Sequence, residues 1–380
     1  MGAPADPADV AHVVALASLT GLGPGRLRRM IAELGPGQAW EAVRGGGLPA
    51  DLVARVRKDV VPTAAKWASE AQRIDPVELL ERHAVAGVGV ALLGSPSYPS
   101  AFVDDPNPPP VIFWSGDPDH LAGMRVGMVG TRDATRYGLD VARDMAADLS
   151  TAGVSVVSGL ALGIDGASHA GALAADGAPP VAVVGGGLDR VYPRAHRQLW
   201  AAVAERGLIL SEYPLGSLPA AWRFPARNRL IAALSDLVVV VESHVTGGSM
   251  ITAMAADERG RPVLAVPGPV TAASSAGTNA LLFDGRAPAR DAADVLLALG
   301  VTVPRRRAGE RRPRPEGAGP AVLAAIPWHA VGIEQLVLST GLELGALMVA
   351  LDALEAQGWV SCTGGWVERL GRDSSAGRAR

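Results

Sequence analysis

Short apolar runs rich in valine recur through the middle of the chain and alternate with longer segments of mixed polarity. The runs do not alternate with polar residues, which is typical of strands that helices cover on both faces. They span residues 88–93, 111–114, 126–129, 154–157, 181–184, 208–210, 237–241 and 263–266. The segments between them fit helices, most clearly at 135–152 and 247–260. The pattern predicts an α/β fold built on an extended Rossmann-like, doubly wound parallel sheet.

The segments on either side of this region have other patterns. Residues 1–75 read as a small N-terminal helical domain, and residues 320–371 as three short helices and a hairpin. Residues 303–319, rich in Arg, Pro and Gly, read as a flexible linker, and residues 372–380 as a disordered tail. The Rossmann-like domain is therefore expected to cover residues 76–302.

Composition narrows the classes of function. The chain has 380 residues and a formal net charge of −3, so any affinity for nucleic acid has to come from local patches. We find neither an apolar run of the roughly 18–20 residues that cross a bilayer nor a signal pattern, and we expect a cytoplasmic protein without membrane association. Because Cys362 is the single cysteine, an intramolecular disulfide is excluded and a thiolate metal cluster is not expected.

Two nucleotide-binding motifs are absent from the sequence. Lysine occurs only at Lys58 and Lys66, in neither case within a Gly-x-x-x-x-Gly-Lys-Ser/Thr loop, which excludes a P-loop ATPase. The α/β region also lacks a Gly-x-Gly-x-x-Gly fingerprint, which argues against dinucleotide binding.

The loops that follow the strands carry glycine, hydroxyl, amide and arginine residues. In a parallel sheet these loops meet in one crevice at the carboxyl ends of the strands. Glycine lets backbone N–H groups approach an anion, and arginine can contact phosphate oxygens in a bidentate manner. The candidate binding residues are Gly130, Thr131, Arg132, Ser158, Gly159, Gly185, Gly186, Gly187, Arg227, Asn228, Arg229, Gly247, Gly248, Ser249 and Thr252. So many candidates predict a site for several phosphates.

The order and spacing of these motifs resemble the DprA/Smf family, the DNA-processing protein A family of natural transformation. The resemblance covers most of residues 85–285. It rests on Gly130-Thr131-Arg132, the run from Ser158 to Leu173, Tyr192-Pro193, Ser211-Glu212-Tyr213-Pro214, Phe224-Pro225-x-Arg227-Asn228-Arg229, Pro267-Gly268 and Gly277-Thr278-Asn279. The resemblance implies a Rossmann-like core that binds single-stranded DNA, forms a homodimer and helps to load RecA recombinase. We interpret the protein as a non-enzymatic binder of single-stranded DNA.

The flanking domains leave alternatives open. The turn Gly21–Gly25, followed by Arg26, Arg28 and Arg29, is similar to a helix-hairpin-helix or sterile-alpha-motif-like module, but it could equally be a solvated turn between helices. The C-terminal segment resembles the winged-helix module of many family members. No Lys or Arg occurs between Ala318 and Glu368, so we interpret this segment as a protein-interaction or regulatory element.

Several candidate side chains have structural alternatives. Asp165 and His169 could suggest a metal or acid–base pair, but Asp165 also suits a helix N-cap. Arg227 or Arg229 could pair with Asp236 or Glu242, and Asn228 could cap a helix. No metal and no cofactor are expected.

Two other functions use the same crevice. A nucleotide-processing enzyme similar to the phosphoribohydrolases needs a carboxylate after the Thr246–Thr252 loop, where Ala253, Met254 and Ala255 stand instead. A sensor of small nucleotides that regulates a partner remains a third hypothesis.

Overall fold

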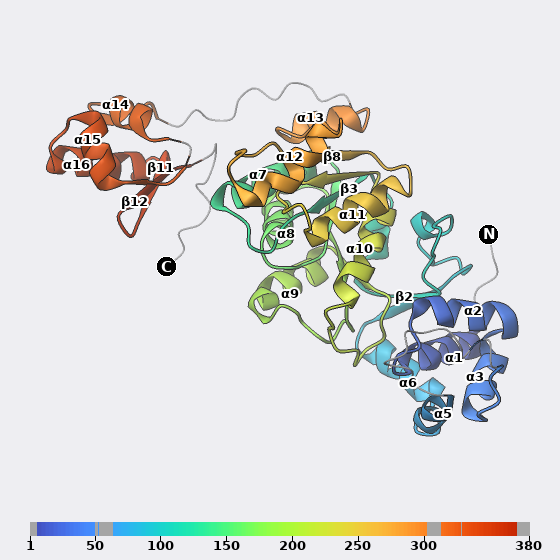
Figure 1. The fold of residues 1–380 in the computed structure, drawn as a ribbon. Helices are drawn as coiled ribbons and strands as arrows, with labels where there is room; N and C mark the ends of the chain where they lie inside the picture. Colours follow the sequence, from blue (N-terminus) through green and yellow to red (C-terminus); the bar gives the residue numbers. More distant parts are fainter. Residues whose placement is uncertain (1–5, 50–51, 53–63, 302–312, 328, 371–380) are drawn as a thin grey trace. The chain divides into compact units, whose positions relative to one another are not determined.

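The computed structural model describes residues 6–49, 52, 64–301, 313–327 and 329–370. The chain forms two compact units, residues 1–301 and 302–380 (Figure 1). Residues 303–312 of the expected linker and the whole expected tail lie outside the described residues. The described part of the linker leads into a helix that begins at Gly319.

A nine-stranded sheet lies at the centre of the first unit, in the order β1-β2-β6-β5-β4-β3-β7-β8-β9. The strands are β1 (Gly89–Leu92), β2 (Val111–Gly116), β3 (Arg125–Val129), β4 (Ser155–Ser158), β5 (Val181–Val184), β6 (Leu208–Ser211), β7 (Leu237–Val240), β8 (Val263–Ala265) and β9 (Ala287–Pro288). Every strand predicted from an apolar run is therefore present.

The sheet departs from the prediction at its two edges. Strands β3 to β9 pair in parallel, but β1 and β2 pair antiparallel to each other, and β2 pairs antiparallel to β6. Only a short 3₁₀ turn, Ser100–Phe102, separates β1 from β2, and parallel neighbours would need a longer crossover. Strand β9 has two residues, too few for an apolar pattern to predict.

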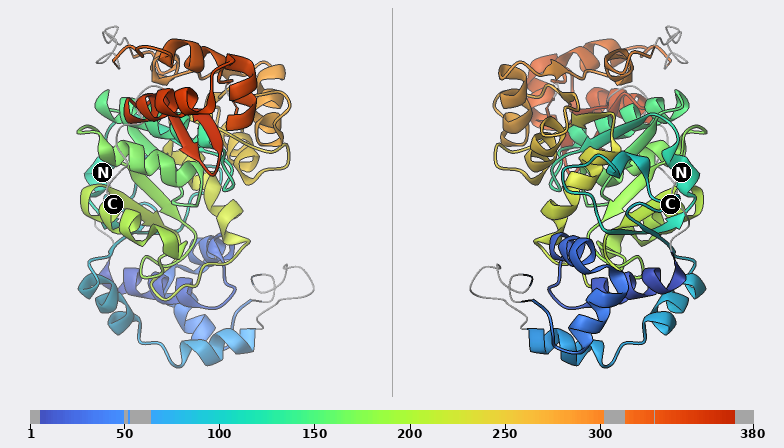
Figure 2. Two further views of the ribbon diagram at one scale, coloured as in Figure 1. Left: turned by 90° about the vertical axis from the view of Figure 1, so that its left-hand side faces the viewer. Right: turned by 90° about the vertical axis from the view of Figure 1, so that its right-hand side faces the viewer.

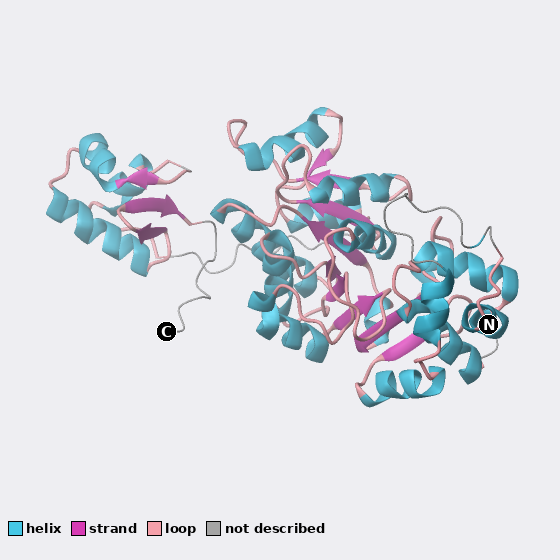
Figure 3. Cartoon of the chain, turned by 60° about the horizontal axis from the view of Figure 1, so that its bottom comes forward, coloured by secondary structure: helices cyan, strands magenta, loops and turns pink. Residues whose placement is uncertain are grey.

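Helices cover both faces of the sheet (Figure 3). Helices α7, α8, α9 and α13 pack on one face, and α10, α11 and α12 pack on the other. Their bounds are α7 (Arg136–Thr151), α8 (Ile164–Ala174), α9 (Arg197–Arg206), α10 (Arg223–Leu234), α11 (Gly248–Asp257), α12 (Ala276–Phe283) and α13 (Ala292–Ala298). This arrangement confirms the doubly wound α/β fold.

The strands have continuous apolar runs because helices bury both faces of the sheet. Val126 and Met128 of β3 pack with α7, whereas Val129 packs in the cluster that includes α10 and α11. Successive side chains of a strand point to opposite faces, so a strand between two helical layers needs apolar residues at every position.

The chain reverses direction across the sheet at β3. Strands β4, β5 and β6 follow one another on one side of β3, and the chain then returns to place β7 on its other side. Loops leaving β3 and β7 diverge at such a reversal and leave a crevice between them.

The N-terminal helices pack against the β1–β2 end of the first unit (Figure 2). They are α1 (Pro7–Ser18), α2 (Pro24–Leu34), α3 (Pro36–Arg44), α5 (Ala64–Ala71) and α6 (Pro76–Val85). Trp40 and Trp67 are buried in the same apolar cluster as Phe113 of β2. Since this core is continuous with the sheet, a domain boundary near residue 75 stays a prediction.

The second unit contains the predicted helices and hairpin. These are α14 (Gly319–Ala325), α15 (Ile333–Thr340), α16 (Leu344–Ala356), β11 (Val360–Thr363) and β12 (Trp366–Arg369), with β10 (Val331–Gly332) completing a sheet in the order β10-β12-β11. The winged-helix assignment stays a prediction.

A search for membrane-spanning helices in the described part of the chain finds no single helix of sufficient length and apolarity. Helices α15 and α16 together have the length and apolar composition of a span, but they are bent by 110° at the break between them.

Candidate functional site

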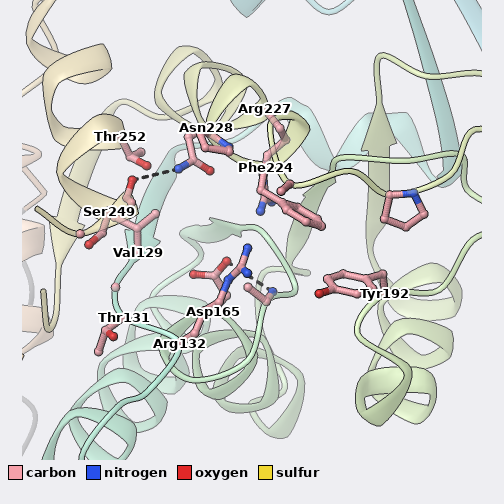
Figure 4. A pocket seen from close by; sticks show the side chains of 17 residues that line it. Val129, Thr131, Arg132, Asp165, Tyr192, Phe224, Arg227, Asn228, Ser249 and Thr252 are labelled. Atoms are coloured by element: carbon pink, nitrogen blue, oxygen red, sulfur yellow. Dashed lines mark hydrogen bonds between the residues drawn. The ribbon is translucent and has the colours of Figure 1, made fainter. Parts of the chain in front are cut away.

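A pocket of about 570 Å³ opens where the strand order reverses, at the carboxyl ends of β3 and β7 (Figure 4). It is lined by Val129, Gly130, Thr131, Arg132, Ala161, Asp165, Tyr192, Pro219, Ala221, Phe224, Pro225, Arg227, Asn228, Gly247, Gly248, Ser249 and Thr252. The pocket thus lies where a doubly wound sheet binds its ligand.

The loop after β3 supplies an exposed cation. Arg132 extends from this loop, and its guanidinium carbon lies 4.9 Å from the centre of the Phe224 ring. The Phe224 ring in turn stacks on Tyr192, with 5.1 Å between ring centres. Figure 4 shows these three side chains around the mouth of the pocket. The wall therefore offers a positive charge beside two aromatic rings.

Gly130 permits the close packing of this loop. A Cβ atom at Gly130 would lie 2.4 Å from Cγ1 of Ile164, which is the first residue of α8. The loop after β3 can therefore pass directly over the start of α8 only because residue 130 has no side chain.

The start of α11 forms another wall. Gly247 is the N-cap residue and provides no side-chain cap, so the first amides of α11 face outward at the positive end of the helix dipole. The Asn228 side chain donates a hydrogen bond to the Gly248 carbonyl at 3.1 Å (Figure 4). The Thr252 hydroxyl is buried beside the pocket and has no hydrogen-bond partner among the described residues. A ligand oxygen could satisfy these donors.

A buried pair of opposite charges forms the inner wall. Arg227 is 3% exposed and donates a hydrogen bond to the Val183 carbonyl, and Asp165 is 7% exposed. Burial lowers the pKa of Arg227 to about 10, against the opposing effect of Asp165. Burial raises the pKa of Asp165, and the charge of Arg227 opposes this shift. Each charge therefore offsets part of the desolvation cost of the other.

The structure brings Gly130, Thr131, Arg132, Arg227, Asn228, Gly247, Gly248, Ser249 and Thr252 of the candidate set to the pocket. Ser158 and Gly159 lie behind it. The Ser158 hydroxyl donates to the Met128 carbonyl at 2.6 Å, and a Cβ atom at Gly159 would lie 2.0 Å from Nη1 of Arg227. Their direct contacts are therefore structural.

The three glycines after β5 also lie outside the pocket lining. A Cβ atom at Gly185 would lie 3.3 Å from Phe224, at Gly186 3.2 Å from the Ser217 carbonyl oxygen, and at Gly187 2.7 Å from Asp189 Oδ1. These glycines therefore allow the loops that carry the pocket residues to pack closely.

Arg229 points away from the pocket. Its guanidinium pairs with Glu212 and donates to the Asn107 carbonyl at 2.8 Å. The alternative that one of the two arginines is structural is confirmed for Arg229, but with a different partner: Asp236 pairs with Arg125, and Glu242 accepts hydrogen bonds from Thr135 and Ser274.

Two local predictions need correction. Residues 224–229 were expected in a loop but lie in helix α10. Asp165 is not an N-cap: the N-cap of α8 is Gly163, and Asp165 lies in the first turn, where it accepts a hydrogen bond from the Ala161 amide at 3.4 Å. Sequence reasoning missed Asp165 and Tyr192 as pocket residues, although both belong to motifs that had been recognised.

Glu242 binds the start of α7. Its carboxylate accepts hydrogen bonds from the Thr135 amide at 2.9 Å, the Thr135 hydroxyl at 2.6 Å and the Ser274 hydroxyl at 3.2 Å. Thr135 is the N-cap of α7, the helix that follows β3. The position that receives a pyrophosphate in dinucleotide-binding proteins therefore holds a carboxylate of the chain itself.

His169 gives a prediction for the dependence of stability on pH. Burial lowers the pKa of His169 to about 3, so between this value and its ordinary pKa of 6.5 the unfolded chain binds a proton that the folded chain does not. Stability from this group is present above pH 6.5 and is lost as the pH falls. Urea unfolding at pH 7 and pH 5 should show a loss about 2 kcal/mol larger in the wild type than in His169→Leu. Equal losses would contradict the assignment.

Within the described residues, no group of three or more His, Cys, Asp or Glu side chains could hold a metal ion. The pocket chemistry visible in the chain is thus that of amides, hydroxyls, two guanidinium groups and one carboxylate.

Comparisons with known proteins identify the family and agree with the fold. The family model described as DNA recombination-mediator protein A matches residues 89–300. The chain is 40% identical over 283 residues to a putative DNA processing protein DprA of Mycobacterium tuberculosis, covering 71% of this chain and 72% of the relative. A solved structure of DprA from Streptococcus pneumoniae is similar with a TM-score of 0.62 and 27% identity, over 78% of this chain and 98% of the other. A DprA from Helicobacter pylori, whose structure concerns its single-stranded DNA binding mode, is similar with a TM-score of 0.51 and 31% identity, over 56% and 95% of the two chains.

Proposed function

Because the chain belongs to the DNA recombination-mediator protein A family, also called DprA/Smf, we propose that its crevice binds single-stranded DNA. In this proposal the pocket holds the phosphate backbone and does not read the base sequence. The related H. pylori protein, described by its single-stranded DNA binding mode, supports this choice of ligand.

The position of Arg132 carries the proposal. It is the exposed guanidinium of the pocket, and it stands opposite the uncapped start of α11 and the buried Thr252 hydroxyl. A phosphate between them would receive a charge-assisted contact from one side and amide and hydroxyl donors from the other. Arg227 would contribute its charge from the inner wall.

The proposal extends to the biological role. We propose that the protein acts in the cytoplasm as a homodimer in natural transformation, protects incoming single strands and helps to load RecA recombinase. No step of bond making or breaking is assigned to the pocket.

A nucleotide-processing enzyme is the second candidate, because Asp165 is an acid among the described residues that line the pocket. Two observations weigh against it. Asp165 is buried and its charge is opposed by that of Arg227. Glu242 occupies the start of α7, at which a mononucleotide phosphate would be expected. A sensor of small nucleotides meets the same obstacle at α7.

Arg132→Ala is expected to weaken binding of a labelled single-stranded oligonucleotide by about tenfold, because a charge-assisted phosphate contact is lost. Fluorescence anisotropy across a salt series should also show that the plot of log affinity against log salt concentration becomes shallower, by roughly 0.7 in slope. Arg206→Ala is the matched control, since Arg206 is exposed at the end of α9 beside the opposite ends of the strands.

Two results would contradict the proposal. Equal affinity of Arg132→Ala and wild type would place the strand elsewhere on the protein. Failure of the wild type to bind any oligonucleotide, together with tight binding of a nucleoside monophosphate, would favour the enzyme or the sensor.

A further inference from the structure

A cluster of aromatic rings lies beside the pocket and takes no part in the site described above. Trp222 is 57% exposed although tryptophan is usually well buried. Its ring meets Tyr213 edge to face, with 6.4 Å between ring centres and an angle of 84°. An exposed tryptophan held in one orientation is typical of a binding surface.

Arg223 stabilises this arrangement. Its guanidinium carbon lies 4.1 Å from the centre of the Tyr213 ring and 5.2 Å from that of Trp222. Nη1 of Arg223 also donates a hydrogen bond to the Leu218 carbonyl at 2.9 Å. The cation is thus placed against the rings by one backbone contact and two cation–π contacts, which fixes the surface in advance of any ligand.

The cluster is next to the crevice along the chain. Ala221 and Phe224, on either side of Trp222 and Arg223 in the chain, both line the pocket. Trp222 and Arg223 instead line a small hollow of about 40 Å³, together with Tyr213 and the turn between α1 and α2. Trp222 follows the pocket-lining residue Ala221 directly, so its Cα atom is about 3.8 Å from that of a residue in the pocket wall.

We propose that Trp222, held in place by the buried Tyr213 and by Arg223, forms a base-stacking platform that receives a nucleobase of the strand next to the phosphates held in the pocket. This inference rests on the proposed function and adds a second type of contact to it. A nucleobase fits because it is planar and uncharged, and stacking accepts any base identity. The neighbouring guanidinium suits a ligand whose backbone is anionic.

The test compares an oligothymidine with an abasic oligonucleotide of the same length, which keeps the phosphates and lacks the bases. Trp222→Ala should bind the oligothymidine roughly tenfold more weakly and the abasic strand as well as the wild type does. Its salt slope should be unchanged, whereas Arg132→Ala should weaken both ligands and lower the slope. Trp222→Phe should restore most of the affinity.

Trp366→Ala is the matched control, because Trp366 is also 57% exposed but lies in the second unit on β12. It should leave both affinities unchanged. Equal weakening of both ligands by Trp222→Ala, or no weakening of either, would overturn the platform while leaving the phosphate site in place. Absence of any salt-dependent oligonucleotide binding by the wild type would overturn both proposals.

Discussion

Arg227→Ala is expected to lower the free energy of unfolding by about 3–5 kcal/mol, because it removes the main positive charge that offsets the burial of Asp165. The substitution also leaves the Val183 carbonyl without this donor and opens a cavity behind the pocket. Urea unfolding at neutral pH measures the loss directly. Arg206→Ala, in an exposed position at the end of α9, should change stability by less than about 0.5 kcal/mol.

A double variant separates the charge effect from the cavity. If the unpaired carboxylate causes the loss, Asp165→Asn combined with Arg227→Met should be more stable than the single Arg227→Met variant. A double variant that is no more stable would mean that the lost packing and the lost hydrogen bond account for the effect. A loss of DNA binding by Arg227→Ala would then reflect lost packing and not a lost contact with phosphate.

Glu242→Ala is expected to cost about 3–5 kcal/mol, since two donors of Thr135 at the start of α7 and the Ser274 hydroxyl lose a charged acceptor. The Glu242 side chain also fixes Thr135, which stands three residues after Arg132, so its removal releases one end of the loop that carries Arg132. Affinity for single-stranded DNA should therefore fall together with stability. Thermal unfolding and anisotropy measure the two effects on one sample.

Glu242→Gln keeps the shape and one acceptor oxygen, and we expect it to lose less stability than the alanine variant. Glu258→Ala removes an exposed glutamate just after α11 and should be close to neutral. A loss below about 1 kcal/mol for Glu242→Ala would show that water replaces the carboxylate without cost.

The strands of the sheet could be predicted from the sequence because each depends on the composition of a few consecutive residues. Each strand from β1 to β8 contains a short apolar run, and burial between two helical layers favours that composition on both faces. The antiparallel edge could not be predicted, since the direction of β1 depends on the absence of a helix between residues 92 and 111.

The site was predicted only in part, and Arg227 and Arg229 show why. In a loop both could reach one ligand, but residues two apart on a helix point to different sides. Once α10 forms, Arg227 faces the pocket and Arg229 faces Glu212. The partners of Asp165 and Glu242 lie far away in the sequence, so no local pattern could identify them.

The short edge strand β9 limits how the nine-stranded sheet can associate with another molecule. β9 has only two residues, and one of them, Pro288, has no amide hydrogen to donate. A strand from another copy would find almost no free backbone groups along this border, so continuation of the sheet into a neighbouring molecule is disfavoured there. Any homodimer that uses this end of the sheet must therefore be held by side chains of the helices and loops around it.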